Sequence, residues 1–443
     1  MSPQKDGYPS PARAWYMVAL LLVIYTISFI DRQLPGLLGK EIMSEFQISY
    51  TKFGILTGFA FAIFYATFGL LCARIADSKS RRGLIAAGLF IWSLMTAATA
   101  LTRSYMMLFL FRMGVGVGEA TLAPAANSLL ADSFKKEKLS TAMSVYSMGI
   151  PVGTALAFIA GGSVIGLADG IPDIDLGALG IISGWKKVFL MVGIPGIVLT
   201  LLLWTIEEPT RKGITGPSGA IPLGAVIAHV KGKLRAYTSV CIGVSLNAML
   251  GFGSVIFVTL FFDKYHGMSS AEVGITFGSI SLITGPAGLL LGGYLADRWY
   301  KQGRKDGNVL GLMVAPLGYA IPAVAFPFMT DTTWAWIMLG ISNLFINLPS
   351  GVAYASLQMI TPNQMRGQII AAYVLCTTII GYGMGPFLIG LFTDQLFGGE
   401  LKYGMILIGV ITTPLCLFMY QWGRRAYAQA LEEEEARLSA VEA

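Results

Sequence analysis

Four ionisable residues lie well inside long apolar stretches of the chain, where charged side chains are rare. They are Asp31, Arg32, Arg112 and Glu119. A charge at the centre of a bilayer costs about 3 kcal/mol or more unless it is paired or hydrated. Such residues normally face one another or a water-filled cavity. The pattern therefore predicts a functional site inside a membrane.

Helix geometry predicts which of the four side chains lie together. At about 1.5 Å per residue, Asp31 and Arg112 fall at matching depth, so we expect them to pair. Glu119 follows Arg112 by two helical turns and lies on nearly the same face, whereas Arg32 is rotated by about 100° from Asp31 and is expected to face a different neighbour. A purely structural ion pair is the alternative, although four charges exceed what one pair needs.

The charge balance of this group favours an anionic solute and a proton. With all four residues ionised the net charge is zero, and protonation of Asp31 or Glu119 leaves a positive pocket. A guanidinium such as that of Arg112 can hold a phosphate or a carboxylate through two bonds. We therefore expect Asp31 and Glu119 to couple transport to protons, and all four residues, Arg32 included, to contact the substrate.

The second half of the chain has no charge at comparable depth. Its polar and aromatic residues predict a second, largely apolar wall, and we expect Asn343, Asn347 and Phe257 to contact the substrate. A cavity that is charged on one side and apolar on the other suits a solute with a charged head and an apolar tail.

Composition places this site in a membrane protein. Of 443 residues, 55% are apolar and 13% charged, and the mean hydropathy is +0.66. The net charge of +6 is scattered over short loops rather than gathered in a basic stripe, which argues against nucleic acid as a partner. His229 and His266 lie near loops and no metal-ligand cluster or nucleophile pair is evident, so we expect no metal, no cofactor and no enzyme activity.

Apolar runs of about 20 residues mark helices that can cross the hydrocarbon layer. Such runs predict an all-α membrane protein with these twelve spans: 14–39, 51–77, 83–102, 105–131, 140–167, 186–206, 236–262, 272–296, 308–328, 333–360, 367–393 and 403–423. Lysine and arginine concentrate in the loops on one side, which predicts cytoplasmic termini. We expect a monomer in a bacterial cytoplasmic membrane.

A repeated loop motif indicates that the chain is duplicated. Asp77 with Arg81 and Arg82 follows the second span, and Asp297 with Arg298 follows the eighth. An acid at a helix end followed by bases suits a conformational latch, to which we also assign Arg366 before the eleventh span. The duplication predicts six-helix bundles at 1–206 and 236–443, joined by a linker at 207–235.

These loops resemble the acid-and-bases motif of the major facilitator superfamily. A second signature of that superfamily matches Arg112, Gly116, Gly118 and Ala120 in the fourth span. The chain departs from the first motif at Ala73, Ser78 and Ser80, where the family usually has glycine, a base and glycine. The resemblance covers essentially the whole chain and implies two six-helix halves around a central cavity.

Within that superfamily the chain looks most like the Spinster lipid transporters. The matching segments are Phe29-Ile-Asp31-Arg32, Gly116-Val-Gly-Glu119-Ala and Glu208-Pro-Thr-Arg211. The resemblance implies a secondary active transporter that moves a lysophospholipid or sphingolipid-like solute by alternating access. A proton-coupled permease for small organic anions is the alternative, because a subfamily of that kind carries similar charges. A passive scramblase or a lipid-binding receptor is a further class that the sequence leaves open.

Overall fold

The protein is helical almost throughout the part that the computed structural model describes, residues 8–175, 177, 181–211 and 222–442. Within these residues, twelve helices are long and apolar enough to cross a membrane. Helices are favoured in lipid because each backbone N–H and C=O finds its partner within the same segment. The predicted all-α membrane architecture with twelve spans is therefore confirmed.

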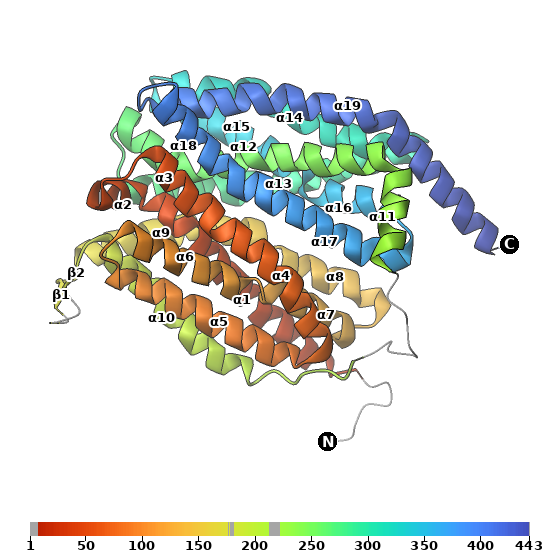
Figure 1. Ribbon diagram of the computed structural model, residues 1–443, viewed down its shortest axis with the longest axis horizontal. Helices are drawn as coiled ribbons and strands as arrows, with labels where there is room; N and C mark the ends of the chain where they lie inside the picture. The colour runs from red at the N-terminus through yellow and green to blue at the C-terminus, as the bar shows by residue number, and fades with distance from the viewer. Residues whose placement is uncertain (1–7, 176, 178–180, 212–221, 443) are drawn as a thin grey trace. The chain divides into compact units, whose positions relative to one another are not determined.

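The first six spans run from red to yellow-green in Figure 1, and several of them are divided into two or more helical segments. Their bounds are α1 (Pro11–Leu37), α2 (Gly39–Phe46), α3 (Tyr50–Gly54), η1 (Ile55–Phe59), α4 (Ala60–Ser78), α5 (Arg81–Ala98), η2 (Thr99–Leu101), α6 (Tyr105–Glu119), α7 (Leu122–Ser133), α8 (Lys136–Ser147), α9 (Gly149–Asp169) and α10 (Trp185–Leu203). Between α9 and α10, strands β1 (Ile174–Asp175) and β2 (Ile181–Ile182) pair antiparallel.

The second six spans follow a short helix, α11 (Leu223–Gly232). Their bounds are α12 (Leu234–His266), α13 (Ser270–Lys301), α14 (Gly307–Ala325), η4 (Phe326–Phe328), α15 (Thr332–Asn347), α16 (Pro349–Met359), η5 (Asn363–Met365), α17 (Arg366–Cys376), η6 (Thr377–Met384), α18 (Gly385–Gln395) and α19 (Leu401–Glu442). The elements η1 and η6 are π-helical turns, which often mark functional sites within helices.

Side-chain caps define where several helices begin. The hydroxyl of Ser80 accepts a bond from the N–H of Gly83 at the start of α5, and Ser104 does the same for Met107 at the start of α6. Each cap satisfies a backbone donor that has no partner within the helix. The cap at Ser104 sets the start of the helix that carries Arg112 and Glu119.

The chain forms two compact units whose boundaries differ from the two halves of the sequence. The first unit comprises Met1–Ser49, Ile55–Pro217 and Ile256–Leu282, and the second comprises Tyr50–Gly54, Ser218–Val255 and Ile283–Ala443. Parts of α12 and α13 thus pack with the first unit, and α3 packs with the second. The bundle boundaries at 206 and 236 remain a prediction about sequence duplication rather than a description of packing.

Each unit has its own apolar core. In the first unit α1 packs on α9, and α5 packs between α6 and α10 around the fully buried Trp92 (Figure 1). In the second unit α14 packs on α15 and α19, and the buried Tyr420 and Tyr427 lie in the core. The aromatic rings fill space between helices, and burial of such rings dominates core energetics.

The largest departure from the predicted spans is at the end of the chain. The last span was expected to end at 423, but α19 continues without interruption to Glu442 (Figure 1). The residues beyond Arg425, such as the run Glu432 to Glu435, are polar yet favour helix by their intrinsic propensity. Hydropathy alone locates the apolar part of a helix and not its polar continuation, so the predicted boundary at 423 marks only the end of the apolar part.

Candidate substrate-binding site and conformational contacts

The four charged residues predicted at depth all lie in the first unit and are almost fully buried. The exposed fractions are 1% for Asp31, 8% for Arg32, 2% for Arg112 and 1% for Glu119. Helix α1 carries Asp31 and Arg32, and α6 carries Arg112 and Glu119. We refer to these four side chains as the charged cluster.

The salt bridge within the charged cluster joins Arg32 to Glu119. The Arg32 Nε donates to Glu119 Oε2 at 2.6 Å, and the Ser28 hydroxyl donates to the same oxygen at 3.1 Å. Arg32 was expected to face a different neighbour from Asp31, and its contact with Glu119 agrees with that prediction. Ser28 precedes Arg32 by four residues, one turn along α1, and both side chains therefore reach the same carboxylate.

Arg112 meets Asp31 through the main chain rather than through the expected pair of charged groups. Its Nη1 donates to the carbonyl oxygen of Asp31 at 2.9 Å. The matching depth of the two residues was therefore predicted correctly, but not the contacting atoms. Depth depends on the rise per residue, whereas the contact also depends on how each helix is rotated about its axis.

Aromatic rings surround the Arg32 guanidinium. Its central carbon lies 4.8 Å from the Phe29 ring centre, 4.9 Å from that of Phe61 and 4.8 Å from that of Tyr65. Arg112 also lies 5.7 Å from the Phe61 ring centre. Ring faces attract cations, more strongly where water is excluded. The sequence analysis missed Phe61 and Tyr65, because nothing in the spacing of α4 indicates that its aromatic face meets α1.

Several polar atoms of the charged cluster are buried without a hydrogen-bond partner among the described residues. They are Asp31 Oδ1, Glu119 Oε1 and Arg112 Nε. Buried polar groups are nearly always satisfied, so each exception calls for an explanation such as a functional role. Two of the atoms are acceptors on carboxylates and one is a donor on a guanidinium. This set has the chemistry to exchange a proton and to bind an anion.

The two asparagines proposed for the second wall form hydrogen bonds within α15 and to α13. Asn343 donates to the Thr284 hydroxyl at 2.7 Å, and Asn347 donates to the carbonyl of Asn343 at 2.7 Å. Phe257 is fully buried, so its ring packs inside the protein here rather than facing an opening. By contrast, Phe252 and Tyr382 are half-buried and stack on one another. A role for Asn343, Asn347 and Phe257 in recognition stays a prediction.

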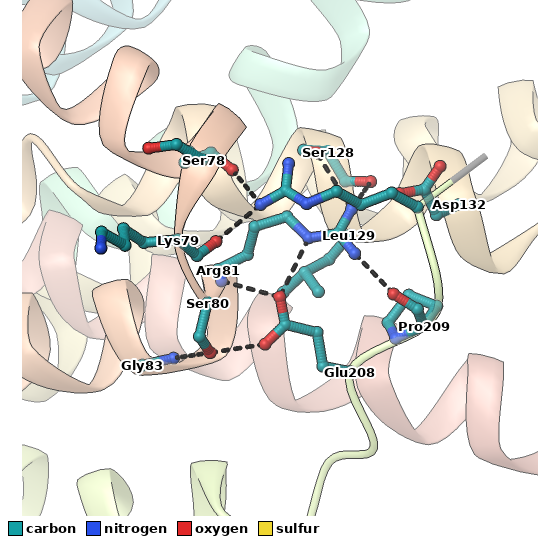
Figure 2. A network of polar contacts seen from close by, with 12 residues as sticks. Ser78, Lys79, Ser80, Arg81, Gly83, Ser128, Leu129, Asp132, Glu208 and Pro209 are labelled. Carbon is teal, nitrogen blue, oxygen red and sulfur yellow. Dashed lines mark hydrogen bonds and ion pairs between the residues drawn. The ribbon is translucent and has the colours of Figure 1, made fainter. Parts of the chain in front are cut away.

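A polar network centred on Arg81 forms at the junction of α4 and α5, and Figure 2 shows its members. The Arg81 side chain, 1% exposed, contacts Asp132 and donates from Nη2 to the Pro209 carbonyl at 2.6 Å. Its main-chain N–H and Nε both donate to Glu208 Oε1, at 2.8 and 3.2 Å. Ser80, the cap of α5, donates to the other oxygen of Glu208 at 2.5 Å.

The electrostatics of the Arg81 network favour an ionised Glu208. Burial by itself would raise the pKa of Glu208, but hydrogen bonds from Ser80 and Arg81 outweigh it and hold the pKa below its usual value. Arg82 donates to the Ile206 carbonyl at 2.8 Å, and Arg211 donates to the Ala76 carbonyl at 2.7 Å. The bases of the first motif therefore tie the end of α4 to the segment after α10. The Asp77 side chain lies outside the described part of the structure.

The second copy of the motif does not form an equivalent network. Asp297 and Arg298 are exposed, and neither side chain has a hydrogen bond or ion pair with any described residue. The acid that forms ion pairs after α13 is instead Asp306, which precedes α14. It pairs with Arg304 at 3.2 Å and with Arg424 at 2.5 Å. Arg366 donates to the Thr361 carbonyl at 3.1 Å. Similar sequence at two places thus leads to different contacts, because the partners come from other helices.

Within the first unit, α2 forms polar contacts that the sequence analysis did not identify. Lys40 pairs with Asp263 of α12 at 2.7 Å, and Ser270 of α13 donates to Glu41 at 3.3 Å. Burial raises the pKa of the Glu41 carboxyl. These contacts join helices from the two halves of the sequence. The charges lie near helix ends, where single-sequence reasoning treats them as ordinary loop residues.

Within the second unit, α3 packs closely on α18. The main-chain N–H and the hydroxyl of Thr51 both donate to Asp394 Oδ2, at 2.7 and 2.6 Å. A Cβ placed on Gly54 would lie 2.3 Å from the Pro386 carbonyl oxygen, and one on Gly390 would lie 2.2 Å from the Tyr50 carbonyl oxygen. Only glycine allows this approach. The π-helical turns η1 and η6 adjoin the contact on α3 and α18 respectively.

Comparison with known families defines the class of protein. The family model for the Major Facilitator Superfamily matches residues 21–386. The chain belongs to the major facilitator superfamily, and it is a secondary transporter. The resemblance noted from the loop motifs is thereby confirmed.

Individual relatives narrow the class to the Spinster type. A solved bacterial homologue of the human lysosomal transporter Spinster, in an inward-facing and unoccupied conformation, has a TM-score of 0.82 and 27% identity, covering 96% of this chain and 99% of its own. Protein spinster homolog 1 of Homo sapiens is 27% identical over 87% of this chain and 74% of its own length. The chain is therefore a transporter of the Spinster type.

Two further relatives carry other names. An MFS-type efflux pump of Mycolicibacterium smegmatis is 28% identical over 96% of this chain and 96% of its own length. The hexuronate transporter of Bacillus subtilis is 24% identical over 86% of this chain and 88% of its own. Relatives with different names thus match most of this chain, so the identity of the solute has to be argued from the site.

Proposed function

We propose that the protein transports an amphipathic anionic solute, with a lysophospholipid or sphingolipid-like structure, by proton-coupled alternating access. The observation that carries the proposal is the charged cluster of α1 and α6. It holds two guanidiniums and two carboxylates with acceptor and donor atoms left unsatisfied. Arg112 binds the anionic head, and Asp31 or Glu119 carries the proton. Both termini face the cytoplasm, and the protein acts as a monomer.

The proposed coupling follows from charge neutrality. The ionised cluster has no net charge, so an incoming anion gains little from it. Protonation of one carboxylate leaves a net positive charge that favours an anion at Arg112, and loss of the proton weakens that binding. A substrate and a proton that stabilise one another's binding in this way are thermodynamically coupled.

A small organic anion is the second candidate, and one observation favours it. The similarity to a hexuronate transporter extends over nearly the whole chain. A hexuronate also carries a carboxylate that suits Arg112, but it has no apolar tail. The two candidates therefore differ in their dependence on the length of that tail.

The test is uptake into proteoliposomes under an imposed proton gradient, with lysophosphatidic acids of increasing acyl length and a hexuronate as alternative solutes. Each buried methylene is worth about 0.8 kcal/mol, so affinity should rise by up to about fourfold per methylene until the apolar wall is filled. Uptake should collapse with a protonophore and in Asp31→Asn or Glu119→Gln. A flat response to tail length with efficient hexuronate uptake would support the organic-anion permease. Uptake that ignores the proton gradient and both variants would refute the coupling.

A further inference from the structure

A basic pocket of about 780 Å³ lies within the second unit. Three segments line it. Arg235 comes from the first turn of α12, Lys305 and Asp306 from the loop between α13 and α14, and Arg425 from the last part of α19. Neither the transport mechanism nor the Spinster resemblance assigns a role to these residues.

The pocket lies where membrane helices leave the apolar zone. The apolar stretch of α19 ends near Tyr420, and Trp422, which lines the pocket, follows directly. The loop at Lys305 and the start of α12 at Leu234 mark the same boundary on the neighbouring helices. Tryptophan is enriched at the level of lipid headgroups, where its ring is apolar on one side and polar on the other. A headgroup in the adjoining leaflet is therefore within reach of the pocket.

The charge of the pocket favours an anion. Its lining contains four cations, Arg235, Lys305, Arg424 and Arg425, against two acids, Asp306 and Glu432, so four minus two leaves a net charge of +2. Arg424 is paired with Asp306 at 2.5 Å, and Lys305 with Glu435 at 2.5 Å. These two pairs fix the floor of the pocket and leave the other two cations available.

Arg235 and Arg425 have no carboxylate partner among the residues that the structure describes. The Arg235 guanidinium lies 4.9 Å from the Trp422 ring centre, with one long bond of 3.5 Å to the Trp422 carbonyl. Arg425 is exposed. A guanidinium that lies over an aromatic ring can still direct N–H groups at a planar or tetrahedral oxyanion. Arg235 of α12 and Arg425 of α19 together offer two guanidiniums for one phosphate.

We propose that this pocket binds the phosphate group of an anionic phospholipid of the adjoining leaflet. Basic pockets between membrane helices recognise such headgroups, and each nearby cation contributes about 1 kcal/mol of attraction to the lipid surface. With the proposed orientation this is the inner leaflet. Binding would join α12 to α19 at the boundary and so stabilise the second unit. The proposal does not depend on the identity of the transported solute.

The test is native mass spectrometry of the purified protein with phosphatidylglycerol and with phosphatidylcholine of the same acyl chains. The double variant Arg235→Gln with Arg425→Gln is compared with Arg298→Gln with Lys301→Gln. The second pair removes the same charge from the end of α13, outside the pocket. The parent should bind phosphatidylglycerol at least about tenfold more tightly than phosphatidylcholine. The pocket variant should lose at least tenfold more affinity for phosphatidylglycerol than the control variant.

Equal losses in the two double variants would overturn the proposal, because general surface charge would then explain the binding. Inorganic phosphate and glycerol 1-phosphate distinguish the source of the phosphate group. If neither compound displaces phosphatidylglycerol at millimolar concentration, the result supports a lipid ligand. Displacement at micromolar concentration would assign the pocket to a soluble phosphate compound and overturn the lipid assignment.

A measurement on the parent protein keeps the proposal testable if the double variant does not fold. Phosphatidylglycerol with a photoreactive group near its headgroup is crosslinked to the protein in membranes, and the labelled peptides are identified. Label at residues 421–432 and near Arg235 supports the pocket. Label confined to other regions overturns it. Because neither experiment measures transport, their outcome is separate from that of the proposed function.

Discussion

At the scale of single residues, the contact between Arg32 and Glu119 is the interaction on which the charged cluster depends. Both side chains are shielded from water, with exposed fractions of 9% and 0%. A buried pair of this kind adds little net stability compared with apolar residues, but removal of one partner leaves an uncompensated charge. A change in the charge of Glu119 is therefore expected to affect the packing of α1 against α6.

Glu119→Gln is expected to destabilise the protein by about 3 to 5 kcal/mol, because Arg32 then remains buried without a carboxylate. The paired replacement Arg32→Met with Glu119→Met should recover most of this loss. Thermal unfolding in detergent measures both effects. The control is Glu207→Gln, since Glu207 pairs with Arg13 in an exposed position, with side chains 65% and 55% exposed. Equal stability of the Glu119 and Glu207 variants would contradict the prediction.

Arg112→Ala is expected to weaken substrate binding at least about tenfold more than Arg112→Lys, because lysine keeps the charge that attracts the anion. Arg112→Lys should still bind less tightly than the parent, since an ammonium cannot form two parallel bonds with one headgroup. Equilibrium binding of a labelled lysophospholipid checks the order. Normal transport by both variants would leave Arg112 with a structural role only, through its bond to the Asp31 carbonyl.

At the scale of elements, short polar contacts at helix ends are positioned to respond to conditions on either side of a membrane. The α2 contacts with α12 and α13 lie in the first unit, and the Arg81 network lies at the junction of α4 and α5. Both sets of contacts involve a carboxylate outside the spans, but the surroundings shift the pKa of these two carboxylates in opposite directions. Burial raises the pKa of Glu41, whereas hydrogen bonds lower that of Glu208.

The contact of α2 with α13 is expected to strengthen as the pH falls. Burial raises the pKa of Glu41 in the folded protein more than the hydrogen bond from Ser270 lowers it, so the packed position of Glu41 favours the neutral carboxyl, and this contribution is lost as the pH rises through the raised pKa. Hydrogen exchange of residues 39–46 should therefore slow as the pH is lowered through that raised pKa. In Glu41→Gln the exchange of this segment, after correction for the intrinsic rate, should no longer depend on pH. The charged groups that face Glu41 are those of Lys40 and Asp263, which form an ion pair.

The latch residues are expected to alter the balance of conformations rather than substrate affinity. Asp77 and Asp297 lie near the ends of α4 and α13, so Asp77→Asn and Asp297→Asn should both shift the accessibility of introduced cysteines on the two sides of the membrane. Arg81→Gln should cause a larger shift than Arg298→Gln, because Arg81 contacts Asp132, Glu208 and Pro209 whereas Arg298 has no described partner. Lost binding with unchanged accessibility would refute the latch assignment.

At the scale of the whole molecule, transport requires contacts that can form and separate, and the contact of α3 with α18 has that character. It relies on glycine at both helices, on one carboxylate and on adjacent π-helical turns. A contact without bulky interlocking side chains separates without rotamer changes, and small residues let helices approach closely.

Gly54→Leu is expected to prevent the close approach of α3 to α18, because a Cβ at this position already meets the Pro386 carbonyl oxygen at 2.3 Å. The measurement is the yield of the disulfide between Thr51→Cys and Asp394→Cys, whose parent side chains are hydrogen-bonded. The yield and the transport rate should both fall. Gly69→Leu in the same span is the matched control, because a Cβ there meets no atom within 4 Å. Equal yields in the two leucine variants would show that the close packing is not required.

The sequence by itself determined the positions of the twelve spans, the class of protein and the four buried charges. The reason is local: a backbone in lipid must form its own hydrogen bonds, so an apolar run of sufficient length becomes a helix wherever it occurs. A charge such as Glu119 inside such a run is conspicuous without any knowledge of its neighbours. The end of α19 was not predicted, because its last part lies beyond the apolar zone and remains helical through the intrinsic helix propensity of its residues.

Only the tertiary structure decided which groups meet. Arg32 rather than Arg112 pairs with Glu119, Glu208 rather than a residue of the same loop binds Arg81, and the repeated motif at Asp297 forms no equivalent network. Each of these contacts depends on the rotation of a helix about its axis and on the crossing of helices distant in sequence. Spacing along one helix predicts the face that a side chain occupies, but the neighbour opposite that face is set by the packing of the whole bundle.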